Sequence, residues 1–409
     1  MGCGAQGLAW VEGLGQGFLL IRFSGEVGVK SGRVRVRYER WILKALLKRL
    51  KEAGAEPGEV HYVFGRAYVP VGDMAAALRE ASRVFGISSV SPAVRSSSAL
   101  GELIEAAVKV AGLALGPGAR FAVKCRRVGE HPYKSPDVVK EVGSAVAKAL
   151  RGRGVRVDLE RPDVTIGIEV RGGDAYIYAG EVEGPGGLPA GCQGKVVCLV
   201  SGGLDSPVAA WMAMRRGCVP LVLHFDSRPF TGRESLDKVM ELARALADWM
   251  PSRRVRVYVA KHGEALSRIK EAAPEGLTCV LCKRIMLRTA CRLAEAKGAK
   301  AVVTGEIIAE QASQTLSNLL VVSAAAAGVP IIRPLAGMDK AEVERLARRI
   351  GTYEISAKPE PGCSAAPRRP RTRVSMEEVR GAEEGLDVDG LVLRELEGLE
   401  EVVVGPGAA

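Results

Sequence analysis

Alternating apolar runs and helical periodicities divide the chain into three parts. The first part, residues 1–95, has helical spacing over 34–50 and 73–84, between short apolar runs that are typical of strands. The predicted strands there are 18–24, 60–70 and 88–92. This order is close to βαββαβ and predicts a small α+β domain of the ferredoxin-like type.

The second part, residues 96–182, also mixes strands and helices. The pattern predicts helices over 102–111 and 135–150, and strands over 120–127, 164–170 and 175–182. The segment that follows, 183–194, is rich in glycine and proline. These residues interrupt either periodicity, so this segment is predicted to be a linker.

The third part, residues 195–375, has the alternation of an α/β domain. Five apolar strands, separated by helical stretches, are predicted at 196–200, 221–225, 255–259, 301–304 and 330–333. Strands this apolar indicate burial on both faces, so the predicted fold class is α/β with a doubly wound parallel sheet. Beyond residue 373 the pattern predicts only a short charged helix and a weak tail, which we assign to residues 376–409.

The composition indicates that the protein binds a polyanionic partner. A chain of 409 residues is long enough for two or three domains. Its net charge of +11 suits a protein that binds nucleic acid, although a generally charged surface would have the same net charge. No apolar run reaches the length of a membrane span, and residues 1–17 lack the pattern of a signal peptide, so we expect a cytoplasmic protein. One Asn and five Gln indicate a heat-loving source.

The hexapeptide SGGLDS, residues 201–206, carries the clearest chemistry. It directly follows a predicted strand, and glycines there let backbone N–H groups approach phosphate oxygens. Ser206 is predicted to cap the following helix, with Pro207 at its first position. A carboxylate beside phosphates suggests that Asp205 holds magnesium or orients a nucleotide group. The segment is not a Walker loop, and the plainer alternative is an ordinary glycine-rich turn.

This hexapeptide resembles the PP-loop of the ATP pyrophosphatases, which split ATP between its α- and β-phosphates and transfer AMP to a substrate oxygen. The resemblance implies an adenine-nucleotide α-hydrolase-like sheet with ATP at the carboxyl ends of its strands. Longer segments resemble the tRNA 4-thiouridine synthetases in particular, with residues 161–217 similar to their junction between THUMP and PP-loop domains. The other matching segments are 279–288, 305–319 and 333–356.

This second resemblance implies an ATP- and Mg²⁺-dependent enzyme that adenylates O4 of a tRNA uridine and then replaces that oxygen with sulfur. The implied catalytic residues are Asp205, Cys363, Asp339 and Lys340. The implied ATP-binding residues are Val200, Ser201, Gly202, Gly203, Leu204, Asp205, Ser206, His224, Phe225, Gly305, Gln314 and Arg333. From the residues alone, the alternative is that Asp339 caps a helix and Lys340 is merely solvated. Likewise, Gln311, Ser313, Gln314 and Thr315 either line the site or cap a helix.

The basic residues of the second part are candidates for binding tRNA through its phosphates. They are Arg120, Lys124, Arg126, Arg127 and Lys134, with Lys30 and Arg33 as weaker candidates in the first part. Each of them is equally well explained as a solvated charge.

Three of the nine cysteines form a second candidate site. Cys279 and Cys282 are spaced as CxxC, and Cys363 lies in a loop rich in Pro and Gly. Three thiolates would leave one iron of a 4Fe-4S cluster open, as in relatives of this family. Zinc, a thiol or persulfide site, and a purely structural role are the alternatives.

The family resemblance leaves the sulfur route open. Many bacterial relatives carry a rhodanese domain, which we do not expect here, so the sulfur donor is expected to be free sulfide, a separate persulfide carrier or a cluster-bound sulfur. The resemblance also implies a homodimer. The alternative functions are a tRNA 2-thiouridine synthetase, which uses the same loop, and a non-catalytic RNA-binding protein.

Overall fold

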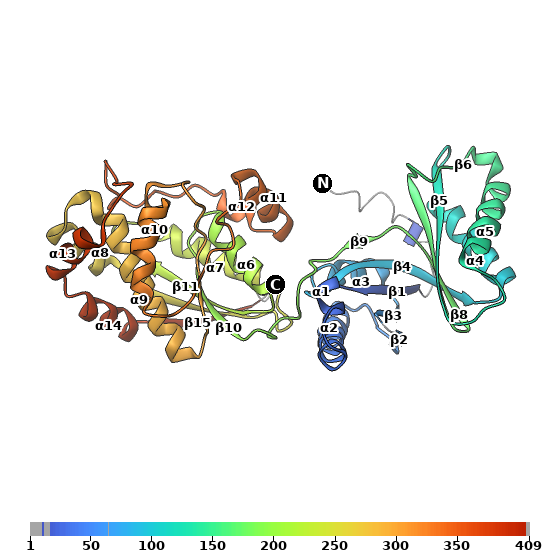
Figure 1. The fold of residues 1–409 in the computed structure, drawn as a ribbon, viewed down its shortest axis with the longest axis horizontal. Helices are drawn as coiled ribbons and strands as arrows, with labels where there is room; N and C mark the ends of the chain where they lie inside the picture. Colours follow the sequence, from blue (N-terminus) through green and yellow to red (C-terminus); the bar gives the residue numbers. More distant parts are fainter. Residues whose placement is uncertain (1–9, 12–16, 64, 406–409) are drawn as a thin grey trace. The chain divides into compact units, whose positions relative to one another are not determined.

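The computed structural model describes residues 10–11, 17–63 and 65–405, and the chain divides into two compact units after Pro189 (Figure 1). Most of the N-terminal segment in which no signal peptide was expected lies outside the described residues, as does the very end of the expected tail. None of the described helices combines the length and the apolar character needed to cross a bilayer.

The first unit is built on one sheet, in which the described residues form nine strands. Eight of them run in the order β2-β3-β1-β4-β8-β7-β5-β6, and β9 pairs with β4. The strands are β1 (Gly17–Phe23), β2 (His61–Val63), β3 (Arg66–Val71), β4 (Ile87–Ser97), β5 (Arg120–Val128), β6 (Arg156–Val157), β7 (Val164–Arg171), β8 (Asp174–Ala179) and β9 (Val182–Glu183). The helices are α1 (Gly25–Gly28), α2 (Gly32–Glu52), α3 (Met74–Ala81), α4 (Leu100–Ala114) and α5 (Ser135–Ala149).

The ferredoxin-like and THUMP-like parts share this sheet. The single strand predicted over 60–70 is a hairpin of β2 and β3, which turns at Gly65 with a φ of +75° that only glycine adopts easily. Because the hairpin replaces one predicted strand with two, the first part has the four strands of the βαββαβ order. Strand β4 runs across the boundary expected at 95/96, pairing with β1 through Ala93 and with β8 through Ser97. Hydrogen bonds therefore cross that boundary without a break.

The first half of the predicted linker is docked on the first unit. Gly184 N–H donates to Ser88 O, and a methyl group added at Gly184 would lie 2.3 Å from Ile87 O. Ser24 Oγ donates to Gly187 O at 2.6 Å. Glycine is needed at 184 because the two backbones approach so closely there.

The second unit contains the predicted doubly wound sheet. Its order is β14-β13-β10-β11-β12-β15, with all neighbours parallel except β12 and β15. The strands are β10 (Lys195–Leu199), β11 (Val219–Asp226), β12 (Val255–Lys261), β13 (Val302–Val303), β14 (Ile331–Ile332) and β15 (Glu400–Val404). The helices are α6 (Asp205–Arg215), α7 (Glu234–Ala247), α8 (Gly263–Ala272), α9 (Thr278–Lys297), α10 (Leu316–Ser323), α11 (Lys340–Ile350), α12 (Tyr353–Ser356), α13 (Met376–Glu384) and α14 (Val388–Glu397).

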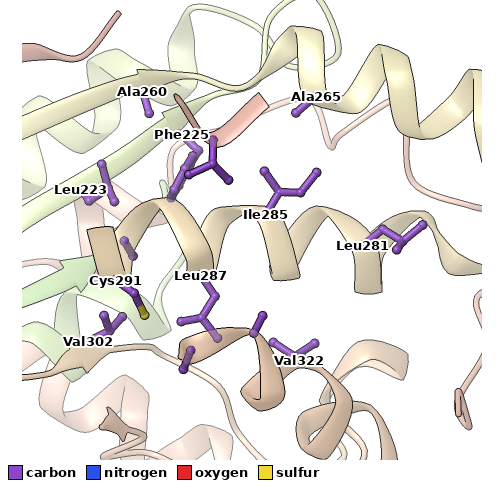
Figure 2. Close-up of a cluster of buried hydrophobic side chains, with 14 of the residues drawn as sticks. Leu223, Phe225, Ala260, Ala265, Leu281, Ile285, Leu287, Cys291, Val302 and Val322 are labelled. Atoms are coloured by element: carbon purple, nitrogen blue, oxygen red, sulfur yellow. The ribbon is translucent and has the colours of Figure 1, made fainter. Parts of the chain in front are cut away.

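Helix α9 is central to the core of this unit. Its buried side chains pack against Leu223 and Phe225 of β11 on one side and Val322 of α10 on another (Figure 2). Burying apolar groups on several sides of one helix stabilises it strongly. The helix therefore gives Cys279 and Cys282, at its first turns, a firmly held backbone.

The C-terminal segment corrects the expectation of a weak tail. Helices α13 and α14 bury Val379 and Leu391 in the main core, and β15 pairs antiparallel with β12. Glu383 of α13 forms ion pairs with Arg284 and Arg288 of α9. The strand was missed because a run of three valines is weak evidence by itself, whereas the free edge of β12 supplies hydrogen-bonding partners.

Candidate active site

The phosphate loop, residues 201–206, lies where the order of the parallel strands reverses, at β10. Strand β10 ends at Leu199 with β11 on one side and β13 on the other, so the loop follows the central strand at its carboxyl end. In open α/β sheets this switch point is where ligands bind. Helix α6 begins within the loop, so its N-terminal N–H groups face the same place.

Ser206 closes the loop and does not cap the helix, which corrects the expected capping. Helix α6 begins at Asp205, two residues earlier than predicted, so Pro207 is at its third position. Ser206 Oγ accepts from Ser201 N–H at 2.9 Å and lies 3.2 Å from Ser201 O, to which it can donate. The serine hydroxyl thus ties the two ends of the loop together.

Gly305 lies against the loop backbone. It follows β13, and a methyl group added there would lie 2.8 Å from both the N and Cα atoms of Ser206. The distance to the carbonyl carbon of Asp205 would be 3.0 Å. Such contacts are shorter than real side chains tolerate, so only glycine lets β13 support the loop at this distance.

Lys340 connects two carboxylates beside the loop. Its Nζ lies 3.2 Å from Asp205 Oδ1 and 2.8 Å from Glu310 Oε1. Burial raises the pKa of Asp205, and Glu310 adds to that rise while Lys340 opposes it. Asp339 accepts from Glu342 N–H and caps α11, which is the alternative that its sequence position left open. Lys340, in contrast, is paired at the loop and is not merely solvated.

Arg333 is bound to a buried carboxylate. Its Nε donates to Glu306 Oε2 at 2.7 Å, and Lys283 Nζ lies 3.1 Å from Glu306 Oε1. Burial alone would raise the pKa of Glu306, but Lys283 and Arg333 outweigh it and lower that pKa. The three charges form a network at the carboxyl ends of β13 and β14.

His224 and Gln314 bring buried polar atoms to this end of the sheet. His224 Nδ1 lies 3.1 Å from Val200 O, and burial lowers the pKa of this histidine, which favours the neutral ring with Nδ1 donating. Within the described residues, His224 Nε2 and Gln314 Oε1 have no hydrogen-bonding partner. Phe225 is buried, and Thr315 accepts from Asn318 N–H, so it caps α10.

Among the described residues, the three candidate cysteines are not grouped to hold a single metal ion. Cys363 is exposed on a loop, whereas Cys279 and Cys282 are partly buried on α9, and burial raises the pKa of Cys279 to about 11. In the part of the chain that the structure describes, no three His, Cys, Asp or Glu side chains are grouped to hold a metal ion. Cys282 and Cys363 both add to the rise of the Cys279 pKa, so the three thiols lie in one neighbourhood even though they are not grouped around one ion.

Cys282 has a buried partner that the sequence pattern did not indicate. His262 Nε2 lies 3.2 Å from Cys282 Sγ, and His262 Nδ1 lies 2.6 Å from Glu395 Oε1 on α14. Thr289 Oγ1 donates to the other oxygen of Glu395 at 2.6 Å. Burial alone would lower the pKa of His262, but Cys282 and Glu395 raise it to about 10.

In the first unit, some of the basic candidates are bonded to other residues of the protein and the others are exposed without an ion-pair partner among the described residues. Arg120 forms a bidentate ion pair with Asp163, so its charge is already matched. Lys124 and Arg126 alternate on β5 with exposed side chains, and Lys134 is exposed before α5. These three residues have no ion-pair partner within the described residues, so they are free to meet phosphates. Arg127 donates to Gly129 O.

Several residues at the site carried no signal of their own in the sequence. Glu310 and Glu306 lie in a segment, residues 305–319, that stands out by family resemblance only, and no pattern pairs either one with Lys340 or Arg333. Lys238 and Glu360 form an ion pair, but the first lies in a charged helix and the second in the Pro- and Gly-rich loop of Cys363, where neither stands out. His262 ends a strand, as many unrelated histidines do. An alignment of relatives is the signal that could have singled them out.

Fold and site together define a class: a PP-loop nucleotide-binding domain preceded by ferredoxin-like and THUMP domains. Three family descriptions match the chain in this order: the ThiI ferredoxin-like domain at residues 18–91, the THUMP domain at 98–179, and Thiamine biosynthesis protein (ThiI) at 191–388. The fold class predicted from the sequence is therefore confirmed.

Relatives of high similarity identify the family. A probable tRNA sulfurtransferase of Methanobrevibacter smithii is 42% identical, over 88% of this chain and 93% of the relative. A tRNA sulfurtransferase of Pyrobaculum aerophilum is 40% identical, over 87% and 71% respectively. A crystal structure described as a 4-thiouridine synthetase–RNA complex with bound ATP has 30% identity and a TM-score of 0.83, over 95% of this chain and 100% of the other. This chain belongs to the tRNA sulfurtransferase family, as the motif resemblance predicted.

Proposed function

We propose that the protein adenylates O4 of a uridine in tRNA and replaces that oxygen with sulfur, giving 4-thiouridine. One observation carries the proposal: a phosphate loop tied by Ser206, supported by Gly305 and flanked by the Lys340–Asp205 pair, in a chain with a THUMP domain. The similar structure of a 4-thiouridine synthetase with RNA and ATP supports the same assignment.

In this proposal the nucleotide phosphates bind at the phosphate loop. Backbone N–H groups and the N-terminus of α6 would hold them, and Lys340 would neutralise charge as pyrophosphate leaves. Asp205 and Glu310 fit Mg²⁺, since this ion is usually bound by one or two carboxylates plus substrate phosphates. When bound, it would supply further charge neutralisation.

Adenylation makes a poor leaving group into a good one. The uridine O4 attacks the α-phosphorus of ATP, and pyrophosphate departs. Hydrosulfide then adds at C4, and the C4–O4 bond breaks as AMP leaves with that oxygen. No net oxidation or reduction occurs when sulfide is the donor.

The sulfur source is sulfide or a persulfide carrier in this proposal. Cys363 is the candidate thiol that a carrier could reach, because it is exposed on the loop after α12. Cys279, Cys282 and Cys363 would be the ligands of a 4Fe-4S cluster, which when bound would supply an iron open to sulfur. Lys124, Arg126 and Lys134 would bind the tRNA backbone. A homodimer, a cytoplasmic location and a thermophilic source belong to the same proposal.

The test is anaerobic incubation of the full chain with unmodified tRNA, ATP, Mg²⁺ and sulfide, followed by nucleoside mass spectrometry. We expect 4-thiouridine in the wild type and none with Asp205→Ala. Cys363→Ala shows whether that thiol is needed when sulfide is supplied. Formation of 2-thiouridine would instead favour the alternative synthetase, and absence of AMP and pyrophosphate would leave an RNA-binding protein.

A further inference from the structure

A negatively charged side chain already lies against the phosphate loop. Glu360 Oε2 would be 2.4 Å from a methyl group added at Gly202, so this carboxylate packs directly on the loop backbone. Glycine at 202 is what lets it approach so closely. A carboxylate at the place where a nucleotide phosphate must bind opposes that binding by charge repulsion.

Glu360 is held there by a buried lysine. Lys238 Nζ of α7 donates to Glu360 Oε2 and to Lys358 O, each at 3.0 Å, and its side chain is only 7% exposed. A methyl group at Gly202 would also lie 3.4 Å from Lys238 Cε, so the lysine reaches the loop itself. An ammonium group has three donors, and two are used by these contacts.

These contacts fasten a strap, residues 356–364, that carries Cys363. Besides Lys238, the strap is held by Ser356, whose Oγ donates to Gly203 O at 3.3 Å. At its other end Ser364 N–H donates to Phe230 O at 2.9 Å. The strap thus contacts the phosphate loop through the Ser356–Gly203 hydrogen bond and the packing of Glu360 on Gly202, so a phosphate entering the loop would meet Glu360.

We propose that Glu360 occupies the phosphate loop as an internal competitor of the nucleotide, and that Lys238 is a phosphate-binding residue held in reserve by it. When phosphate enters, Lys238 exchanges Glu360 for a phosphate oxygen, and the strap carrying Cys363 is released. This inference rests on the proposed function, because it takes the loop to be an ATP site. It links filling of that site to freeing of the loop that bears Cys363.

The test measures binding of α,β-methylene-ATP to the full-length protein by calorimetry. Glu360→Gln should bind about tenfold more tightly than the wild type, because the competing charge is gone. Lys238→Met keeps the apolar stem and should bind at least tenfold more weakly. Glu354→Gln is the matched control: it removes the same charge from an 86%-exposed side chain in the neighbouring helix and should bind like the wild type.

Hydrogen exchange of the peptide covering the strap gives a second readout. In the wild type, exchange should rise when α,β-methylene-ATP binds, and in Glu360→Gln it should already be high without nucleotide. The inference is overturned if Glu360→Gln binds nucleotide no more tightly than the wild type, or if nucleotide slows exchange of the strap. A wild-type protein that binds no ATP analogue refutes the proposed function as well, so the two failures are distinguishable.

Discussion

Gly305 offers a direct test of how the phosphate loop is supported. In Gly305→Ala the new methyl group would lie about 0.6 Å inside ordinary contact with the N and Cα atoms of Ser206. The atoms that the methyl group meets belong to the backbone at the start of α6, so they cannot move away by a change of side-chain rotamer. Either β13 or the loop must therefore shift.

Overpacking of this kind costs about 1–3 kcal/mol. If the shift is taken up by the phosphate loop, the same energy is lost from transition-state stabilisation, since each 1.36 kcal/mol changes the rate about tenfold. We therefore expect kcat/KM for ATP to fall about 10- to 100-fold. The assay is tRNA-dependent release of AMP, with the free energy of unfolding measured by denaturant titration beside it.

The matched control is Gly381→Ala in α13, where a new methyl group meets no atom within 4 Å. That variant should keep wild-type activity and gain slightly in stability, because alanine favours helix. Activity of Gly305→Ala within twofold of the wild type would refute the reasoning. It would mean that the contact relaxes without moving the loop.

Three further predictions concern charged side chains. Lys340→Met should lower the rate of AMP formation about 100-fold, since it removes the cation beside the departing pyrophosphate; a fall of less than fivefold contradicts this role. Glu383→Gln should lower the free energy of unfolding by about 3 kcal/mol, because it leaves Arg284 buried without its carboxylate. Lys124→Gln with Arg126→Gln should weaken tRNA binding and reduce the slope of log K against log salt by about two; an unchanged slope would place the RNA elsewhere.

The Glu383 prediction also has a pH dependence. Burial alone would raise the pKa of Glu383, but Arg284 and Arg288 outweigh it and lower the pKa to about 2, below the ordinary 4.5. A carboxylate with a depressed folded pKa stabilises the protein above its unfolded pKa, and this contribution is lost as pH falls from about 4.5 to 2. Acid unfolding of the wild type should show this loss. Glu383→Gln should lack it, and an identical acid profile in both proteins would contradict the assignment.

The sequence by itself determined the local elements and the chemistry written within them. The apolar strands, the glycine-rich hexapeptide after β10 and the family motifs are contiguous, so periodicity and resemblance were enough to predict the fold class and the phosphate loop. The expected cap at Ser206 was wrong, because α6 begins two residues before the predicted start at Pro207. Helix ends depend on hydrogen bonds that compete, and here the Ser206 hydroxyl bonds to Ser201 instead.

Only the tertiary structure decided which distant residues meet at the loop. Gly305 lies against Ser206, Lys340 reaches Asp205, and Lys238 holds Glu360, all across crossovers of the doubly wound sheet. The pairing of β15 with β12 and the bond between His262 and Cys282 are of the same kind. Local propensity encodes each element, but side-chain pairing depends on strand order, on register and on how far each side chain reaches. Those quantities are fixed only when the sheet is assembled.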